Sequence, residues 1–285
     1  MDPNPWDDAL GQGLMTTVVA LVIVGVGWWN SGRGRKVLHK WGVPAPGDEQ
    51  TRAVMGYLRR RWIWYPWFVG ASAVLGVALA EHGFRPGAYA FLGFMVGGVL
   101  GDVVCALGAR RDSQKRHGLF ELVPPWAVLL YGGLVVMTIA FAVVDLMAGP
   151  HLPAAVANVM SPPPAELMAG PPAWSPFAAT AVGALVVGTG LVLCMRRSIA
   201  ADDAVDTALR RRSARVVLGM AFPLQLLIAA MSVWRTKTVG DHEEHAMVPS
   251  WPGTFADVVQ PVLFAGFLVV LFAWIRVAGP AAGRR

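Results

Sequence analysis

Apolar residues in this chain gather in seven long blocks separated by shorter polar segments. The blocks cover residues 10–29, 63–80, 86–108, 125–147, 174–195, 216–234 and 255–275. At a rise of ~1.5 Å per residue, a helix of about 20 residues crosses the ~30 Å hydrocarbon layer of a membrane. The pattern therefore predicts an all-α polytopic membrane protein, with a single transmembrane domain of seven helices over residues 1–285.

Composition agrees with this prediction. Apolar residues make up 55% of the 285 residues and charged residues only 15%, whereas a soluble domain carries about 25% charged residues. None of the polar segments is long enough to form a separate extramembrane domain. The segment 148–173 contains seven prolines and no lysine or arginine, so we expect an irregular or disordered extracytoplasmic loop there.

The basic residues fall in alternate segments between the blocks. Of the 24 lysines and arginines, 21 lie in segments 30–62, 109–124 and 196–215 or in the tail after residue 275. Only Arg85, Arg235 and Lys237 lie in the other segments. Because basic loops stay on the cytoplasmic side of a membrane, the pattern predicts an outer N-terminus and an inner C-terminus.

The same distribution limits the classes of partner. The formal net charge of +6 would suit nucleic acid if the basic residues covered one folded domain that also offered aromatic side chains for stacking. They flank membrane blocks instead, so we expect no nucleic-acid binding. We interpret the basic residues as contacts with anionic lipid headgroups at the cytoplasmic face.

Two of the cytoplasmic segments resemble each other. Residues 48–61 (DEQTRAVMGYLRRR) and 202–215 (DDAVDTALRRRSAR) both begin with paired acids and reach Leu-Arg-Arg-Arg before an apolar block. Acids at the start of a helix and arginines near its end suit the helix dipole, so each segment is predicted to form a short interfacial helix. Two interpretations remain open: a 3+1+3 arrangement of parallel repeats, or arginine clusters of the kind that commonly precede inward helix ends.

A family resemblance rests on these juxtamembrane segments. They read RGRKVLHKWGVPAPGDEQ (33–50), YLRRRWIWYP (57–66) and DDAVDTALRRRSARVV (202–217). Together they resemble an uncharacterised family of multi-spanning membrane proteins from actinobacteria. The resemblance implies a multi-pass protein of the bacterial plasma membrane, and it implies no activity, cofactor or catalytic residue.

Asp102 is the one acidic residue well inside a block. It follows Gly93, Gly97 and Gly101, whose four-residue spacing lets another helix approach closely. A carboxylate in hydrocarbon is costly and is often functional, so one interpretation is a proton or cation relay. The alternative is a structural carboxylate that bonds a neighbouring helix or pairs with a juxtamembrane arginine.

Two blocks contain proline beside glutamine. Pro223 and Gln225 lie near the middle of block 216–234, and Gln260 and Pro261 lie in block 255–275. Proline removes a helical hydrogen bond and leaves a carbonyl without its usual donor. Interrupted helices often hold the substrate sites of transporters, but kinked helices also occur in membrane proteins without any transport role.

An acidic and histidine-containing segment follows block 216–234. It reads DHEEH (241–245), and its two histidines, His242 and His245, are spaced so that they share one helical face with Glu243 nearby. Histidine and carboxylate ligands suit a divalent metal. The alternative is a solvated acidic turn, because the spacing is not that of a zinc protease motif. Further ligands from other outer loops would be Glu81, His82 and His151.

The known catalytic patterns do not match. There is no nucleotide-binding glycine loop of the GxxxxGK[ST] type, and none of the six histidines lies inside a block, where a membrane haem would need one. We therefore expect no enzymatic activity and no cofactor. The leading hypothesis is a non-enzymatic accessory or scaffold component of a membrane complex. The alternatives are a small-solute transporter and an extracytoplasmic metal-binding sensor or enzyme.

Overall fold

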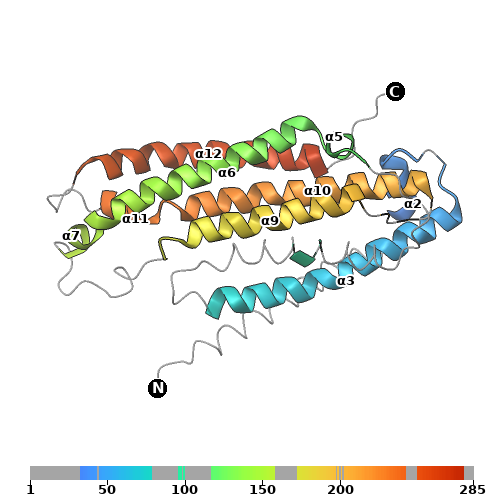
Figure 1. Ribbon diagram of the computed structural model, residues 1–285, viewed down its shortest axis with the longest axis horizontal. Helices are drawn as coiled ribbons and strands as arrows, with labels where there is room; N and C mark the ends of the chain where they lie inside the picture. The colour runs from blue at the N-terminus through green and yellow to red at the C-terminus, as the bar shows by residue number, and fades with distance from the viewer. Residues whose placement is uncertain are drawn as a thin grey trace, which may run out of the picture.

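The computed structural model describes residues 33–43, 45–78, 96–97, 99, 117–157, 172–196, 198, 200, 202–241 and 249–278. Every regular element within these ranges is a helix, and the helices form an elongated bundle (Figure 1). Four helical stretches in these ranges are long and apolar enough to cross a membrane: Pro125–Ala155, Ser175–Arg196, Asp203–Gly240 and Trp251–Val270. The chain is thus all-helical where it is described, and its composition is that of a membrane-embedded protein.

These stretches contain four of the seven blocks. Block 125–147 forms α6 (Pro125–Ala148), and block 174–195 forms α9 (Ser175–Arg196). Block 216–234 lies largely in α10 (Asp203–Met231), and block 255–275 lies in α12 (Trp251–Ala278). Block 10–29 lies outside the described residues, as does block 86–108 apart from residues 96, 97 and 99, and block 63–80 is described to residue 78. The total of seven spans therefore stays a prediction.

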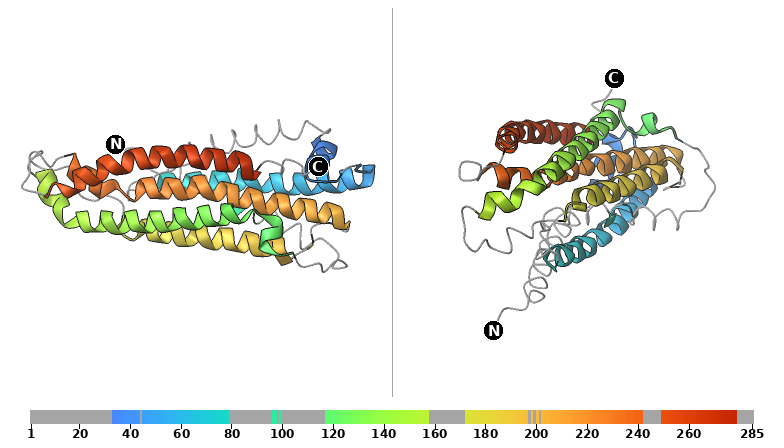
Figure 2. Two further views of the ribbon diagram at one scale, coloured as in Figure 1. Left: turned by 90° about the horizontal axis from the view of Figure 1, so that it is seen from above. Right: turned by 60° about the vertical axis from the view of Figure 1, so that its left-hand side comes forward.

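The helices alternate in direction along the bundle. Helices α3 (Asp48–Ala78), α6 and α10 begin at one end, whereas α9 and α12 begin at the other (Figures 1 and 2). Arg196 ends α9, and the arginines at 210, 211, 212 and 215 lie in the first turns of α10, so we call this end the basic end and the other the opposite end. The alternation agrees with the order of inward and outward blocks in the sequence.

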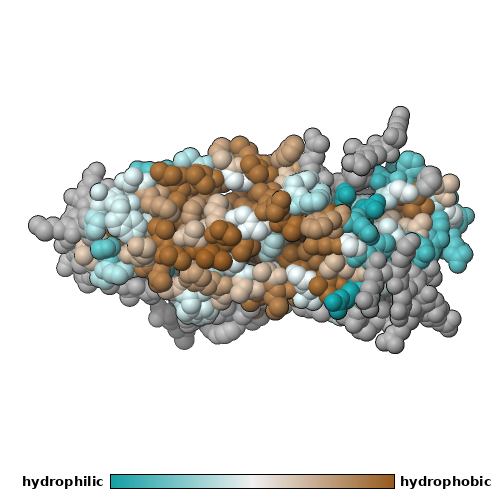
Figure 3. Space-filling view, turned by 45° about the horizontal axis from the view of Figure 1, so that its top comes forward, coloured by the Kyte–Doolittle hydropathy of each residue, from teal (hydrophilic) through white to brown (hydrophobic). Residues whose placement is uncertain are grey.

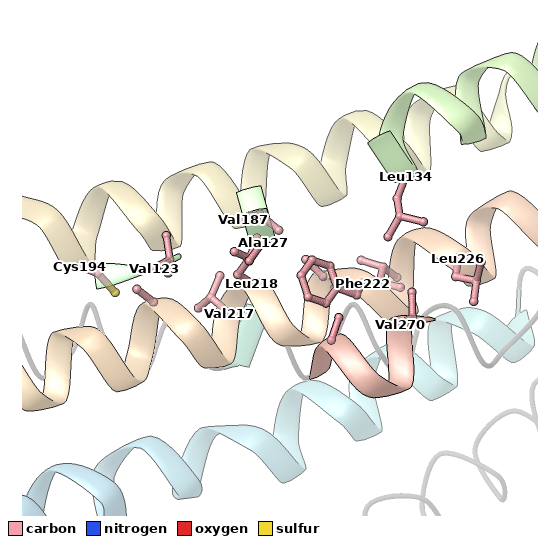
Figure 4. Packing of buried hydrophobic residues seen from close by; sticks show 14 of the residues in the cluster. Val123, Ala127, Leu134, Val187, Cys194, Val217, Leu218, Phe222, Leu226 and Val270 are labelled. Carbon is pink, nitrogen blue, oxygen red and sulfur yellow. The ribbon is translucent and has the colours of Figure 1, made fainter. Parts of the chain in front are cut away.

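Helix α10 is the central element. It packs against α6, α9 and α12. Of the apolar 18-residue stretch in its span, 67% is buried inside the bundle, against 12–28% of the corresponding stretches in the other three spans. Figure 4 shows side chains from these helices meeting around Phe222 of α10, including Leu134 of α6, Val187 of α9 and Val270 of α12. The buried polar side chains of this helix are therefore surrounded by other helices.

The other three spans expose large apolar side chains. The space-filling view shows a hydrophobic band across the middle of the bundle, with hydrophilic residues gathered at the basic end (Figure 3). A face this apolar suits lipid acyl chains and not water. The most exposed members on α6, α9 and α12 are Leu129, Val136, Met147, Leu185, Phe264 and Phe272.

A second apolar cluster ties the first part of the chain to α10. Helix α2 (Arg33–Lys40) is followed by a turn at Gly42, whose φ of 95° favours glycine and lets the chain change direction. The side chains that follow meet α3 and the first turns of α10 to form the basic-end cluster. The cluster contains Leu38, Trp41, Val43, Val54, Tyr57, Leu58, Val205, Ala208 and Leu209.

The two segments predicted to be short interfacial helices are each continuous with the apolar helix that follows. Residues 48–61 are the first turns of α3, and residues 203–215 are the first turns of α10. Both helices run unbroken through these junctions, although Pro66 in α3 leaves the carbonyl of Trp62 without its helical donor. The two segments also contact each other in the basic-end cluster.

Short helices form the opposite end. After α10, the turn at Ser232 and Val233 leads into α11 (Trp234–Gly240), which packs against α6 and α12. The segment expected to be irregular begins with η2 (Gly149–His151) and α7 (Leu152–Ala157), because Leu152 and Ala155 are buried against Val239 of α11. Residues 158–171 lie outside the described ranges. At the basic end, α5 (Leu119–Leu122) precedes α6.

Candidate functional site

Two of the leading candidate site residues from the sequence, Pro223 and Gln225, lie within the described part of the chain. Both lie in the interior of α10, and the side chain of Gln225 is 1% exposed. Asp102, His242, Glu243 and His245 lie outside the described residues, so their proposed roles stay predictions. Gln260 and Pro261 belong to α12, where Pro261 is exposed.

Gln225 is the centre of a buried polar cluster that joins three helices. Its amide nitrogen donates to the hydroxyl of Thr138 on α6 at 2.8 Å and to the hydroxyl of Thr180 on α9 at 3.3 Å. The Thr138 hydroxyl in turn donates to the carbonyl of Leu134 at 2.8 Å. Thr138 is 0% and Thr180 4% exposed, so the whole cluster lies in the packed interior. We call Thr138, Thr180 and Gln225 the mid-bundle cluster.

One atom of the mid-bundle cluster has no hydrogen-bond partner within the described structure. This atom is the amide oxygen Oε1 of Gln225. Two residues earlier, Pro223 lacks the N–H that would bond the carbonyl of Gly219. An open acceptor in an apolar interior costs free energy unless a donor reaches it. The cluster can therefore accept one more hydrogen bond.

A buried ion pair lies at the opposite end, and the sequence pattern did not predict it. Asp145 near the end of α6 is 2% exposed. One oxygen accepts from Arg235 Nη1 at 3.1 Å, and the other accepts from the backbone nitrogen and the hydroxyl of Thr236, at 2.9 and 3.2 Å. The pair fixes α11 on α6. The one sequence signal for this pair is an aspartate three residues before the end of an apolar helix.

A second buried ion pair lies at the basic end. Arg210 Nε is 2.7 Å from Asp206 Oδ2, one turn earlier on α10, and the two side chains are 0% and 2% exposed. Arg210 Nη1 also donates to the carbonyl of Met195 on α9, and the backbone nitrogen of Ala200 donates to Asp206. Arg210 was expected to contact lipid headgroups with its neighbours. It instead packs inside the bundle and holds the end of α9 against α10.

The basic end also links α3 to α10. Tyr57 and Ser213 are joined by a hydrogen bond between their buried hydroxyls. The side chain of Gln50 donates to Asp202 at 3.0 Å. Asp202 caps α10 by accepting from the backbone nitrogen of Val205 at 2.9 Å. The bonds from Val205 and then from Gln50 lower the pKa of Asp202, because both favour its charged form.

A metal centre finds no support in the part of the chain that the structure describes. No group of three histidine, cysteine or acidic side chains in that part could hold an ion. His151, one of the suggested additional ligands, lies in η2 near the opposite end. The three residues of the predicted metal site lie outside the described ranges, so that site stays a prediction.

Comparisons with family models, with curated proteins and with solved structures find no match for this chain. Three levels of buried polar contacts follow one another along α10 and α11: Arg210 at the basic end, Gln225 in the middle and Arg235 at the opposite end. At each level, a polar side chain of α10 or α11 forms a hydrogen bond with a residue of α6 or α9.

Proposed function

We propose that this chain is a non-enzymatic accessory or scaffold component of a membrane complex, anchored by seven helices in the bacterial plasma membrane with its basic end in the cytoplasm. The observation that supports an accessory role is the use of the buried polar groups. Asp145 and Arg210 bond neighbouring parts of the bundle, and so does the nitrogen of Gln225. Polar groups used in this way stabilise one arrangement of helices.

The exposed face of α12 supports a protein partner. Only 12% of the apolar 18-residue stretch of this helix is buried. The helix carries the exposed aromatic side chains of Phe264, Phe267 and Phe272. Aromatic side chains contribute strongly to protein interfaces because each covers a large area with few rotatable bonds. We infer that a transmembrane helix of the partner packs on this face.

Purification from the native membrane in mild detergent, after chemical cross-linking, tests this proposal. We expect one protein to co-purify in a fixed ratio, and replacement of Phe264 and Phe267 by alanine to reduce its recovery. The matched control is Leu185→Ala on α9, another exposed apolar side chain, which should leave recovery unchanged. Recovery of this chain alone, or equal loss from the control, would contradict the proposal.

Small-solute transport is a second candidate because one observation favours it. The mid-bundle cluster has an open acceptor, Gln225 Oε1, beside the proline of α10. Open polar groups beside helix interruptions are typical of substrate sites in transporters. A solute with a hydroxyl, amide or ammonium group would supply the missing donor.

Reconstitution in liposomes separates the two candidates. Transport predicts uptake of at least one solute from a panel of amino acids, sugars, amines and polyols, and loss of that uptake in Gln225→Leu. The control is Thr254→Val, an exposed position on α12, which should transport normally. The accessory function predicts no uptake by any of the three proteins.

A further inference from the structure

Two arginines of the Leu-Arg-Arg-Arg segment differ from Arg210 in their surroundings. Arg211 and Arg215 are one helical turn apart on α10, so they lie on the same face. Both are half-buried. Arg211 Nε donates to the carbonyl of Glu121, and Arg215 Nε donates to the carbonyl of Leu122, each at 3.3 Å. Consecutive carbonyls at the end of α5 thus hold two positive charges side by side.

This arrangement brings two like charges close together. Like charges one turn apart on a helix repel each other, and an anion bound between them would relieve that repulsion. A guanidinium has five N–H donors in a planar fork that matches a phosphate. For Arg211, the bond through Nε fixes the position of the group, and its other N–H donors suit an anion.

The nearest acidic side chain on α5 is turned toward its own loop. Glu121 Oε2 lies 3.2 Å from His117 Nδ1 and accepts from the backbone nitrogen of Gly118 at 3.3 Å. The Glu121 carboxylate is therefore engaged by the segment before α5. Arg211 Nε donates to the backbone carbonyl of Glu121, not to its carboxylate. This bond holds Arg211 beside α5.

Exposed aromatic side chains flank the carbonyls that the two arginines bond. Phe120 of α5 and Trp126 of α6, on either side of the carbonyls that the arginines bond, are exposed at 65% and 45%. The guanidinium of Arg215 also lies 5.6 Å from the ring centre of Trp41, a distance typical of a cation–π contact. Aromatic and basic side chains together mark the headgroup level of a membrane.

We propose that Arg211 and Arg215 form a binding site for the phosphate of an anionic glycerophospholipid. The phosphate lies between the two guanidinium groups where α5 meets α10, and the acyl chains follow the exposed apolar surface of α6. This site goes beyond the proposed accessory function and does not depend on it, because it requires only that the bundle is in a lipid bilayer.

Lipid binding to the purified full chain in detergent tests the site. Native mass spectrometry with added phosphatidylglycerol should show one retained lipid, and phosphatidylcholine should be retained far less. Arg211→Gln and Arg215→Gln should each weaken binding by about tenfold, since a hydrogen bond to a charged group contributes about a factor of ten. Glutamine can still donate to the carbonyls of α5, so the fold should persist, as a thermal unfolding scan would verify.

The controls separate this site from general charge and from free phosphate. Arg196→Gln removes an exposed arginine at the same end and should leave binding unchanged. Arg211→Lys keeps the charge without the planar fork and should bind with intermediate affinity. Equal losses in Arg196→Gln and Arg211→Gln would overturn the proposal, and so would equal retention of both lipids. Displacement of the lipid by millimolar inorganic phosphate would show a free-phosphate site and also overturn it.

Discussion

At the scale of single residues, the surroundings of a charge determine its role more than its type does. Arg210 and Arg211 are neighbours in one basic run, yet Arg210 is fully buried on Asp206 and Arg211 is half-buried beside α5. Successive helical residues point about 100° apart, so neighbours must face different surroundings. Substitutions in such a run should therefore have unequal effects.

The Asp145–Arg235 pair should contribute more to stability than a shorter but exposed pair. Asp145→Asn keeps an acceptor for Thr236 but removes the carboxylate charge that pairs with Arg235 inside the bundle. We expect a loss of about 3 kcal/mol in the free energy of unfolding, since breaking a buried pair costs about that much. Denaturant titration of the protein in detergent micelles measures it.

The exposed pair of Arg35 and Asp48 is the matched control. Its atoms are closer, 2.8 Å against 3.1 Å, but its side chains are 64% and 86% exposed. Exposed pairs contribute about 0–1 kcal/mol, so Asp48→Asn should change stability little. Similar losses in the two variants would show that burial does not determine the strength of these pairs.

Asp202 gives the basic end a defined dependence on pH. Hydrogen bonds from Val205 and Gln50 lower the pKa of Asp202, so its stabilising effect is present above its unfolded pKa of about 3.9 and is lost as pH falls through the lower folded value. The melting temperature of the wild type should fall more steeply below about pH 4 than that of Asp202→Asn. Identical slopes would contradict this assignment.

At the scale of helices, the sequence predicts where each helix lies in the chain better than it predicts which side chains of different helices are in contact. Helices α6 and α9 match their blocks to within a residue or two at each end, because a long apolar run is a local property. The contact of Asp145 with Arg235 spans 90 residues, and local periodicity contains no information at that range. The Asp206–Arg210 pair was within reach of sequence reasoning, because its members are one turn apart.

The mid-bundle cluster shows the same division. The sequence singles out Gln225 because it lies near a proline in an apolar block, and interrupted helices often hold substrate sites. Its partners Thr138 and Thr180 were not identified, since threonine is common in membrane helices and gives no signal alone. The fold of each helix was therefore predictable, whereas the network between helices required the three-dimensional arrangement.

The contact between α11 and α12 depends on two glycines. A Cβ atom added to Gly240 would lie 2.7 Å from the Cα atom of Gly253, closer than packed carbon atoms approach. Gly240→Ala should therefore separate the helices and lower stability by about 1–3 kcal/mol. The control is Gly132→Ala on α6, which meets nothing within 4 Å and should be neutral or slightly stabilising. A neutral Gly240→Ala in the same unfolding assay would contradict the close contact.

At the scale of the whole molecule, the basic end should face the cytoplasm. Basic residues on α2, on α3 and at the end of α9 lie at this end, and such residues resist transfer across the membrane. An export-dependent reporter fused after residue 157 should be active, and the same reporter fused after residue 200 should be inactive. The reverse result would overturn the proposed orientation, although the packing within the bundle would stand.

The order of polar contacts along the chain has a consequence for biosynthesis. Gln225 bonds Thr138 and Thr180, and Arg235 bonds Asp145. In each case the later residue finds partners that were synthesised before it. A ribosome delivers α6 and α9 to the membrane ahead of α10, so the buried polar side chains of α10 enter beside helices that already carry their hydrogen-bond partners, which lowers the cost of unsatisfied polar groups in lipid. Moving the α9 segment behind α12 by gene rearrangement would keep every residue, but α10 would then enter the membrane before α9 and its partner Thr180.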